Sequence, residues 1–98
     1  RDAFRAYVDA LWEGDETPDL VLVDGRFRIA SFLTTLLRAN PGTVVIFDDY
    51  IPRKPFHVVE DFLAPERWNT RQALFVVPED VDRPAIEDAR DAFLMVRE

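Results

Sequence analysis

Ninety-eight residues are enough for one hydrophobic core but too few for two independent catalytic domains. Twelve basic and nineteen acidic residues give a formal net charge of −7, which disfavours binding to nucleic acid and to anionic membrane surfaces. Cysteine is absent, which excludes disulfides and a thiolate nucleophile. The sequence has no apolar run near the roughly 20 residues of a membrane span and no basic leader, so we expect a cytoplasmic protein.

The first half of the sequence alternates between helical and strand patterns. Residues 3–12 have apolar side chains at three and four spacing, which predicts an amphipathic helix. Residues 19–24 (DLVLVD) predict a strand buried on both faces, and residues 26–39 predict a second helix that ends before Asn40, Pro41 and Gly42. Residues 43–47 (TVVIF) repeat the strand pattern and stop at Asp48 and Asp49.

The second half predicts shorter elements. Residues 56–63 indicate a short helix, and residues 66–68 with 73–77 indicate the two arms of an antiparallel hairpin. A last helix begins at Asp82, with Ile86, Ala89, Phe93 and Leu94 on one face. Because a strand, a helix and a strand in succession favour parallel pairing, we expect an α/β sandwich with parallel strands and an antiparallel hairpin at one edge.

Three acidic side chains follow the two predicted parallel strands. Asp24 ends the first strand, and Asp48 and Asp49 end the second, at the edge where open parallel sheets bind ligands. Neighbouring strand ends lie about 5 Å apart, so one carboxylate is protonated or a cation lies between them. A divalent metal such as Mg²⁺ bound by Asp24, Asp48 and Asp49 is one interpretation. The alternative is that Asp24 caps the following helix and the other two end a strand in solvent.

Other polar and aromatic residues surround these strand ends. Arg26 and Arg28 are candidates to bind an anionic substrate group, although pairing with the acids is the favoured interpretation. His57 is a candidate general base, and its alternative role is a surface or capping histidine. Tyr50, Phe56 and Trp68 are candidates to wall a substrate, or else packing residues.

The segments DLVLVDGRFR (19–28), GTVVIFDDY (42–50) and HVVE (57–60) resemble class I S-adenosylmethionine-dependent methyltransferases, in particular bacterial methyltransferase-like proteins of undefined substrate. The resemblance covers about residues 19–77. It implies a Rossmann-like three-layer sandwich, with residues 1–98 as the C-terminal half of the domain. It also implies S-adenosylmethionine as cofactor, held mostly by residues outside this chain, a small-molecule acceptor for O- or N-methyl transfer, and catalytic roles for Asp24, Asp48 and His57.

The sequence departs in two places from the patterns of the methyltransferases that it resembles. A more distant similarity to metal-dependent catechol and caffeoyl-CoA O-methyltransferases matches the acids at positions 24, 48 and 49, but Phe27 stands where those enzymes have a lysine. The three glycines, Gly14, Gly25 and Gly42, form no glycine-rich cofactor loop. Two further hypotheses therefore stay open: a non-catalytic α/β interaction module that self-associates as a homo-oligomer, and, less favoured, a metal-dependent hydrolase.

Overall fold

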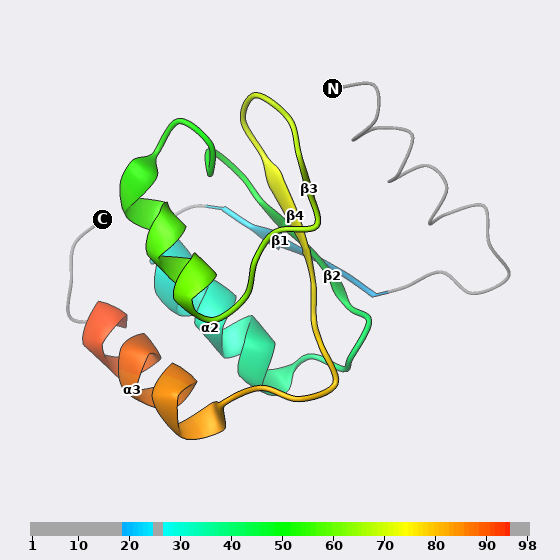
Figure 1. The fold of residues 1–98 in the computed structure, drawn as a ribbon. Coiled ribbons are helices and arrows are strands. Elements are labelled where there is room, and N and C mark those ends of the chain that lie inside the picture. The colour runs from blue at the N-terminus through cyan, green and yellow to red at the C-terminus, as the bar shows by residue number, and fades with distance from the viewer. Residues whose placement is uncertain (1–18, 25–26, 95–98) are drawn as a thin grey trace, which may run out of the picture.

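A computed structural model describes residues 19–24 and 27–94. The described part holds one four-stranded sheet in the order β1-β2-β4-β3, with its helices on one face (Figure 1). Its strands are β1 (Leu20–Val23), β2 (Val44–Phe47), β3 (Arg67–Trp68) and β4 (Ala73–Val76). The helices are α2 (Arg28–Arg38), the 3₁₀ helix η1 (Lys54–Asp61) and α3 (Arg83–Leu94). The helix predicted at residues 3–12 lies outside the described residues.

The strands β1 and β2 are parallel neighbours, as predicted. Val23 pairs with Phe47 and Leu20 with Val44, and α2 makes the connection between the two strands. The hairpin is also confirmed: β4 is antiparallel to both β2 and β3. The expected α/β fold with parallel strands and an antiparallel edge is therefore present.

The main core lies between the sheet and α2. An apolar stripe along α2 buries Ile29, Phe32, Leu33 and Leu36 against the inward side chains of the sheet. Phe32 packs edge-on against Phe75 of β4, with ring centroids 4.6 Å apart. The stripe follows the 3.6-residue period of a helix, which explains why α2 could be predicted from sequence.

The two remaining helices begin within two residues of their predicted starts. The helix expected at 56–63 is η1, which starts two residues earlier because Pro55 fits the first turn of a helix. In α3, the Asp82 carboxylate accepts a hydrogen bond from the Ala85 N–H (3.3 Å) and so caps the first turn. Ile86 is buried as expected, whereas Leu94 is exposed.

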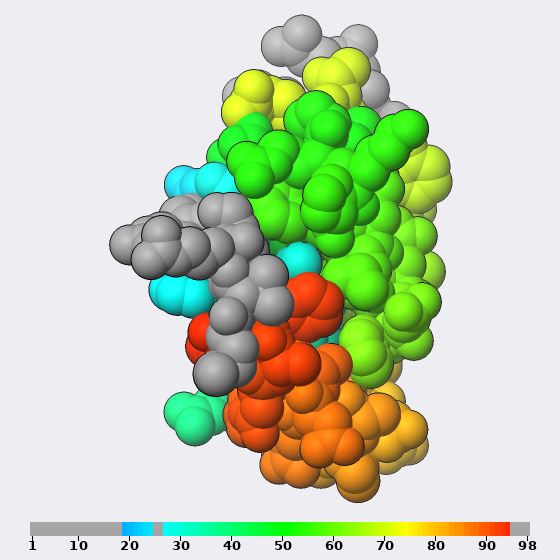
Figure 2. Space-filling view, turned by 90° about the vertical axis from the view of Figure 1, so that its left-hand side faces the viewer, coloured from blue at the N-terminus to red at the C-terminus, as the bar shows by residue number. Residues whose placement is uncertain are grey.

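The helices cover one side of the sheet together, with η1 in green and α3 in orange to red (Figure 2). The other face of the sheet carries a second apolar cluster of Val44, Ile46 and Leu74. Leu20 and Leu22 belong to this second face, since they pair with Val44 and Ile46, yet they are 49% and 61% exposed. In the described part of the chain, no helix has the length and hydropathy that a membrane crossing requires.

Candidate functional site

The carboxyl ends of β1 and β2 meet at one edge of the sheet. The Asp48 N–H donates to the Val23 carbonyl (3.1 Å), which brings the acids at positions 24, 48 and 49 to the same rim. Asp49 adopts a left-handed backbone conformation (φ 57°), which aspartate tolerates better than most residues. The predicted side-by-side arrangement of the two strand ends is therefore confirmed.

The cation between these acids is Arg28. Its Nη2 lies 2.9 Å from Asp24 Oδ1, and its Nη1 lies 3.3 Å from both Asp49 Oδ2 and the Asp48 carbonyl oxygen. The Arg28 side chain is only 12% exposed, and its guanidinium carbon lies 5.5 Å from the centre of the Phe56 ring. The expectation that Arg28 pairs with the acids is thus confirmed.

The backbone before α2 directs Arg28 to this position. Phe27 is the N-cap residue of α2 and has φ 57° and ψ 42°, a left-handed conformation that is rare for a bulky side chain. Non-glycine residues in this region cost free energy and are concentrated at functional sites. The chain therefore accepts local strain at the point where α2 begins and Arg28 enters the cluster.

Sequence reasoning missed two members of the cluster, Arg71 and Gln72. Arg71 forms an ion pair with Oδ1 of Asp49, and Gln72 Nε2 donates to Asp48 Oδ1 (3.2 Å). Both residues precede β4, whose first residue, Ala73, pairs with Phe47. The signal that could have revealed them is the antiparallel hairpin, because a returning strand begins at the edge where its neighbour ends.

The donor set at this edge does not fit a divalent metal. Asp24 and Asp49 are both engaged by the Arg28 guanidinium, which fills the space between them. Within residues 19–24 and 27–94, no group of three or more histidine, cysteine, aspartate or glutamate side chains is arranged to hold a metal ion. The predicted Mg²⁺ site of Asp24, Asp48 and Asp49 therefore has no support in this geometry, because an internal cation neutralises the acids.

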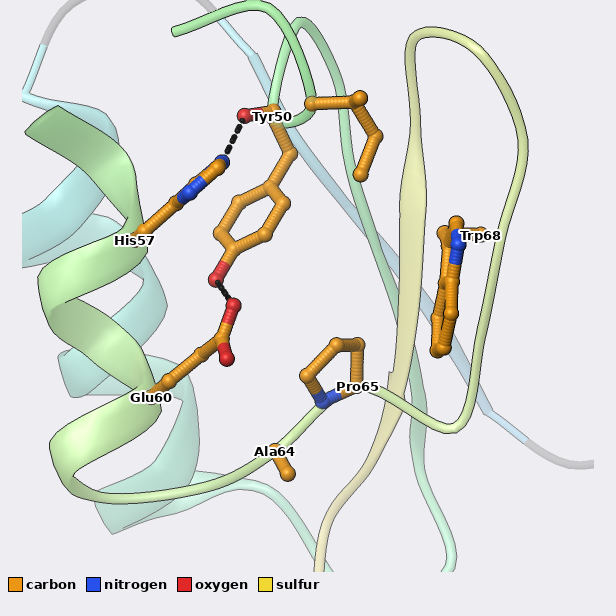
Figure 3. A pocket seen from close by; sticks show the side chains of 7 residues that line it. Tyr50, His57, Glu60, Ala64, Pro65 and Trp68 are labelled. Carbon is orange, nitrogen blue, oxygen red and sulfur yellow. Dashed lines mark hydrogen bonds between the residues drawn. The ribbon is translucent and has the colours of Figure 1, made fainter. Parts of the chain in front are cut away.

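A cavity of about 350 Å³ opens beside this cluster, next to the turn that follows β2 (Figure 3). Its walls come from that turn, from η1 and from the chain leading into β3. The lining residues are Tyr50, Ile51, His57, Glu60, Ala64, Pro65 and Trp68. Of the three aromatic candidates for the wall of a substrate site, Tyr50 and Trp68 line this cavity. The third, Phe56, is buried, and the guanidinium carbons of Arg28 and Arg53 lie over its ring.

A short hydrogen-bond chain organises one side of the cavity. The Tyr50 hydroxyl donates to Glu60 Oε2 (2.5 Å), and His57 Nε2 lies 2.8 Å from the Tyr50 carbonyl oxygen. The His57 and Tyr50 rings are stacked, with centroids 4.6 Å apart. Burial of the ring and the adjacent Glu60 carboxylate raise the pKa of the Tyr50 hydroxyl far above its ordinary value, so Tyr50 remains a neutral donor.

The predicted site residues thus fall into two groups. Asp24, Arg28, Asp48 and Asp49 form the cluster at the strand ends, while Tyr50 and His57 line the cavity. The ring of His57, a candidate general base, lies against Tyr50, with Nε2 facing the Tyr50 carbonyl and the two rings stacked. Arg26, the other candidate for an anionic substrate group, lies outside the described residues.

Comparisons with known proteins give one informative result. No protein-family model matches the chain, and no curated protein matches it either. The crystal structure of a methyltransferase-like protein from Silicibacter pomeroyi matches with a TM-score of 0.65 and 33% sequence identity. The match covers 93% of this chain and 50% of that one, so this chain spans half the length of the matched protein. The chain therefore has the fold of part of a methyltransferase-like protein.

Proposed function

We propose that this chain forms half of an S-adenosylmethionine-dependent methyltransferase domain and supplies the side that faces the methyl acceptor. The observation that carries the proposal is the similarity to a methyltransferase-like structure of twice the length. It is supported by the polar cluster of Asp24, Arg28, Asp48 and Asp49 at the carboxyl ends of parallel strands, the usual position of ligands in open α/β sheets.

The second apolar face of the sheet supports the half-domain assignment. Leu20 and Leu22 lie on β1, an outer strand of the described sheet, and continue the apolar surface of Val44 and Ile46. An exposed apolar edge strand is a surface that proteins usually cover with another strand or helix. In our proposal, the remaining half of the domain pairs with β1 and covers this face.

S-adenosylmethionine would supply an electrophilic methyl group to the acceptor. The residues of this chain would position the acceptor and accept its proton, which are the effects that methyl transfer to oxygen or nitrogen requires. We assign positioning to Asp48 and Arg28. We assign proton acceptance to His57, and specifically to Nδ1. Its other ring nitrogen, Nε2, faces a carbonyl oxygen that can only accept a hydrogen bond, so Nε2 carries the hydrogen.

Calorimetric titration of the full-length polypeptide with S-adenosylmethionine and with S-adenosylhomocysteine tests this proposal. We expect saturable binding of both. No heat of binding at millimolar cofactor would lead us to abandon the methyltransferase assignment. A double variant, Asp24→Ala with Asp48→Ala, should retain cofactor binding but lose methyl transfer.

A second candidate function is a non-catalytic interaction module that has kept this fold. The exposed Leu20 and Leu22 favour it, because the same apolar edge could join two copies of the chain. This hypothesis predicts that the Asp24→Ala, Asp48→Ala variant keeps its cellular function, whereas Leu22→Lys loses it. Both candidates need the apolar face of β1, so they differ in whether the cell also requires the acids at the strand ends.

A further inference from the structure

The cavity beside the strand ends combines an aromatic wall, apolar surface and one carboxylate. In Figure 3, Glu60 and His57 project from η1 on one side, Pro65 and Ala64 lie below, and the indole of Trp68 stands on the opposite side. The indole is seen edge-on, so its flat face is turned toward the cavity. The volume of about 350 Å³ falls in the range of sites for small organic molecules.

The cavity lining carries formal negative charge. Glu60 is the carboxylate among the lining residues, and lysine and arginine are absent from that lining. Tyr50 occupies Glu60 Oε2, which leaves Oε1 to accept a hydrogen bond from a ligand. Because the Tyr50 hydroxyl stays protonated, it fixes the carboxylate in place without adding a second charge.

Trp68 is an unusual residue to leave uncovered. Its side chain is 59% exposed on the two-residue strand β3, although large aromatic side chains are normally mostly buried. The face of an indole attracts cations through its quadrupole and also packs against apolar groups. A carboxylate and an exposed indole across one cavity therefore favour the same ligand charge.

We propose that this cavity binds a small organic cation, an ammonium group attached to an apolar or aromatic body. The ammonium group donates to Glu60, and the body packs against Trp68, Pro65 and the Tyr50 ring. An anion would meet the uncompensated carboxylate. A neutral molecule would gain the apolar contacts and forgo the ion pair and the cation–π attraction. The inference stands apart from methyl transfer, since no S-adenosylmethionine is needed for it.

Three soluble probes with the same phenylethyl body separate the effect of charge from that of apolar contact. They are phenethylamine, which is cationic, 2-phenylethanol, which is neutral, and 3-phenylpropanoate, which is anionic. Binding to the full chain at pH 8 is followed by the chemical shift of the Trp68 indole N–H. The sequence has two tryptophans, Trp12 and Trp68, so Trp68→Leu assigns the signal.

We expect phenethylamine to bind about fivefold more tightly than 2-phenylethanol, the factor that corresponds to about 1 kcal/mol from a partly exposed ion pair. The anion should bind more weakly than both. Glu60→Gln keeps the side-chain size and an acceptor for the Tyr50 hydroxyl but removes the charge. It should therefore shrink the preference for the amine to the smaller part that the cation–π attraction of Trp68 contributes.

Asp61→Asn is the matched control, because it removes a neighbouring carboxylate that does not line the cavity. It should leave the preference for the amine intact. Equal binding of the amine and the alcohol to the unmodified protein, a Glu60→Gln variant whose preference for the amine is undiminished, or no binding of any probe would overturn the proposal. None of these outcomes depends on whether the protein binds S-adenosylmethionine, so the two proposals fail separately.

Discussion

Arg28 Nη1 lies 3.3 Å from Oδ2 of Asp49, a residue 21 positions later in the sequence, and joins the start of α2 to the turn after β2. The same guanidinium contacts Asp24, so one side chain pairs with acids from two strand ends. This arrangement makes Arg28 the residue on which the cluster depends, and the first two predictions test it.

Arg28→Met should destabilise the protein by about 2 kcal/mol. The variant keeps much of the apolar stem but removes the guanidinium that Asp24 and Asp49 share, while Arg71 still pairs with Asp49. The expected loss is below that of a fully buried pair because Asp24 is half exposed. Urea unfolding measures the change. Arg90→Met is the control, because its ion pair with exposed Asp91 should contribute less than about 0.5 kcal/mol. Equal losses in the two variants would show that the cluster adds nothing special.

Removal of Arg28 should also create a response to divalent cations. Arg71 still pairs with Asp49 Oδ1 in this variant, so the oxygens that can share Ca²⁺ or Mg²⁺ are the two that Arg28 contacts, Asp24 Oδ1 and Asp49 Oδ2. A metal concentration about five times the Kd should stabilise Arg28→Ala by about 1 kcal/mol. Thermal unfolding with and without 10 mM CaCl₂ tests this. The unmodified protein should show no such gain, and a gain of the same size in both proteins would contradict the role given to Arg28.

The Tyr50 hydroxyl should make stability fall at high pH. Its pKa is raised above the ordinary value of 10.0, first by burial and then by the hydrogen bond and charge of Glu60. Above about pH 10, the unfolded chain therefore releases a proton that the folded protein retains, and the free energy of unfolding decreases. Stability measured from pH 8 to 11 should decline less steeply in Tyr50→Phe. An identical slope in that variant would place the titrating group elsewhere.

Tyr50→Phe should also lower stability at neutral pH by about 1 kcal/mol, the usual net value of a hydrogen bond. The partner, Glu60, is exposed and can be hydrated when the hydroxyl is lost, which keeps the loss small. Denaturant unfolding at pH 7 gives this value, and Glu60→Gln should cost less because an amide oxygen still accepts. A larger loss for Glu60→Gln than for Tyr50→Phe would be inconsistent with the bond described.

The two faces of β1 should respond differently to substitution. Val23 is buried in the main core, so Val23→Ala should cost about 2 kcal/mol. Leu22 is largely exposed, so Leu22→Lys should change the stability of the chain by less than about 0.5 kcal/mol. Chemical unfolding compares the two. A large loss for Leu22→Lys would show that the second face is already covered.

The parts of the fold that the sequence predicted depend on simple periodicity. The runs that became β1 and β2 are continuous and apolar, and the stripe of α2 has the helical period, so their parallel pairing and the position of Asp24 and Asp48 followed directly. The tertiary structure has features that the periodicity of the sequence does not predict. The left-handed backbone of Phe27 directs Arg28 toward the acids, and no local sequence pattern predicts that conformation.

The cavity could not be predicted from the sequence, for a related reason. Glu60 and Tyr50 are ten positions apart, and they meet because η1 lies against the turn after β2. His57 comes from the same helix and stacks on the Tyr50 ring. A sequence can show that such residues are near one another, but side-chain directions decide which of them touch.

The reversal of the chain in the β3–β4 hairpin has a consequence for how this protein could diversify. Because β4 is antiparallel to β2, the tight turn at residues 69–72 lies at the edge of the sheet where the other strands end. Lengthening that turn would rebuild the rim beside Asp48 and Asp49 while the buried layer beneath stayed untouched. Altered ligand preference could therefore arise from insertions in a single short connection, at little risk to folding.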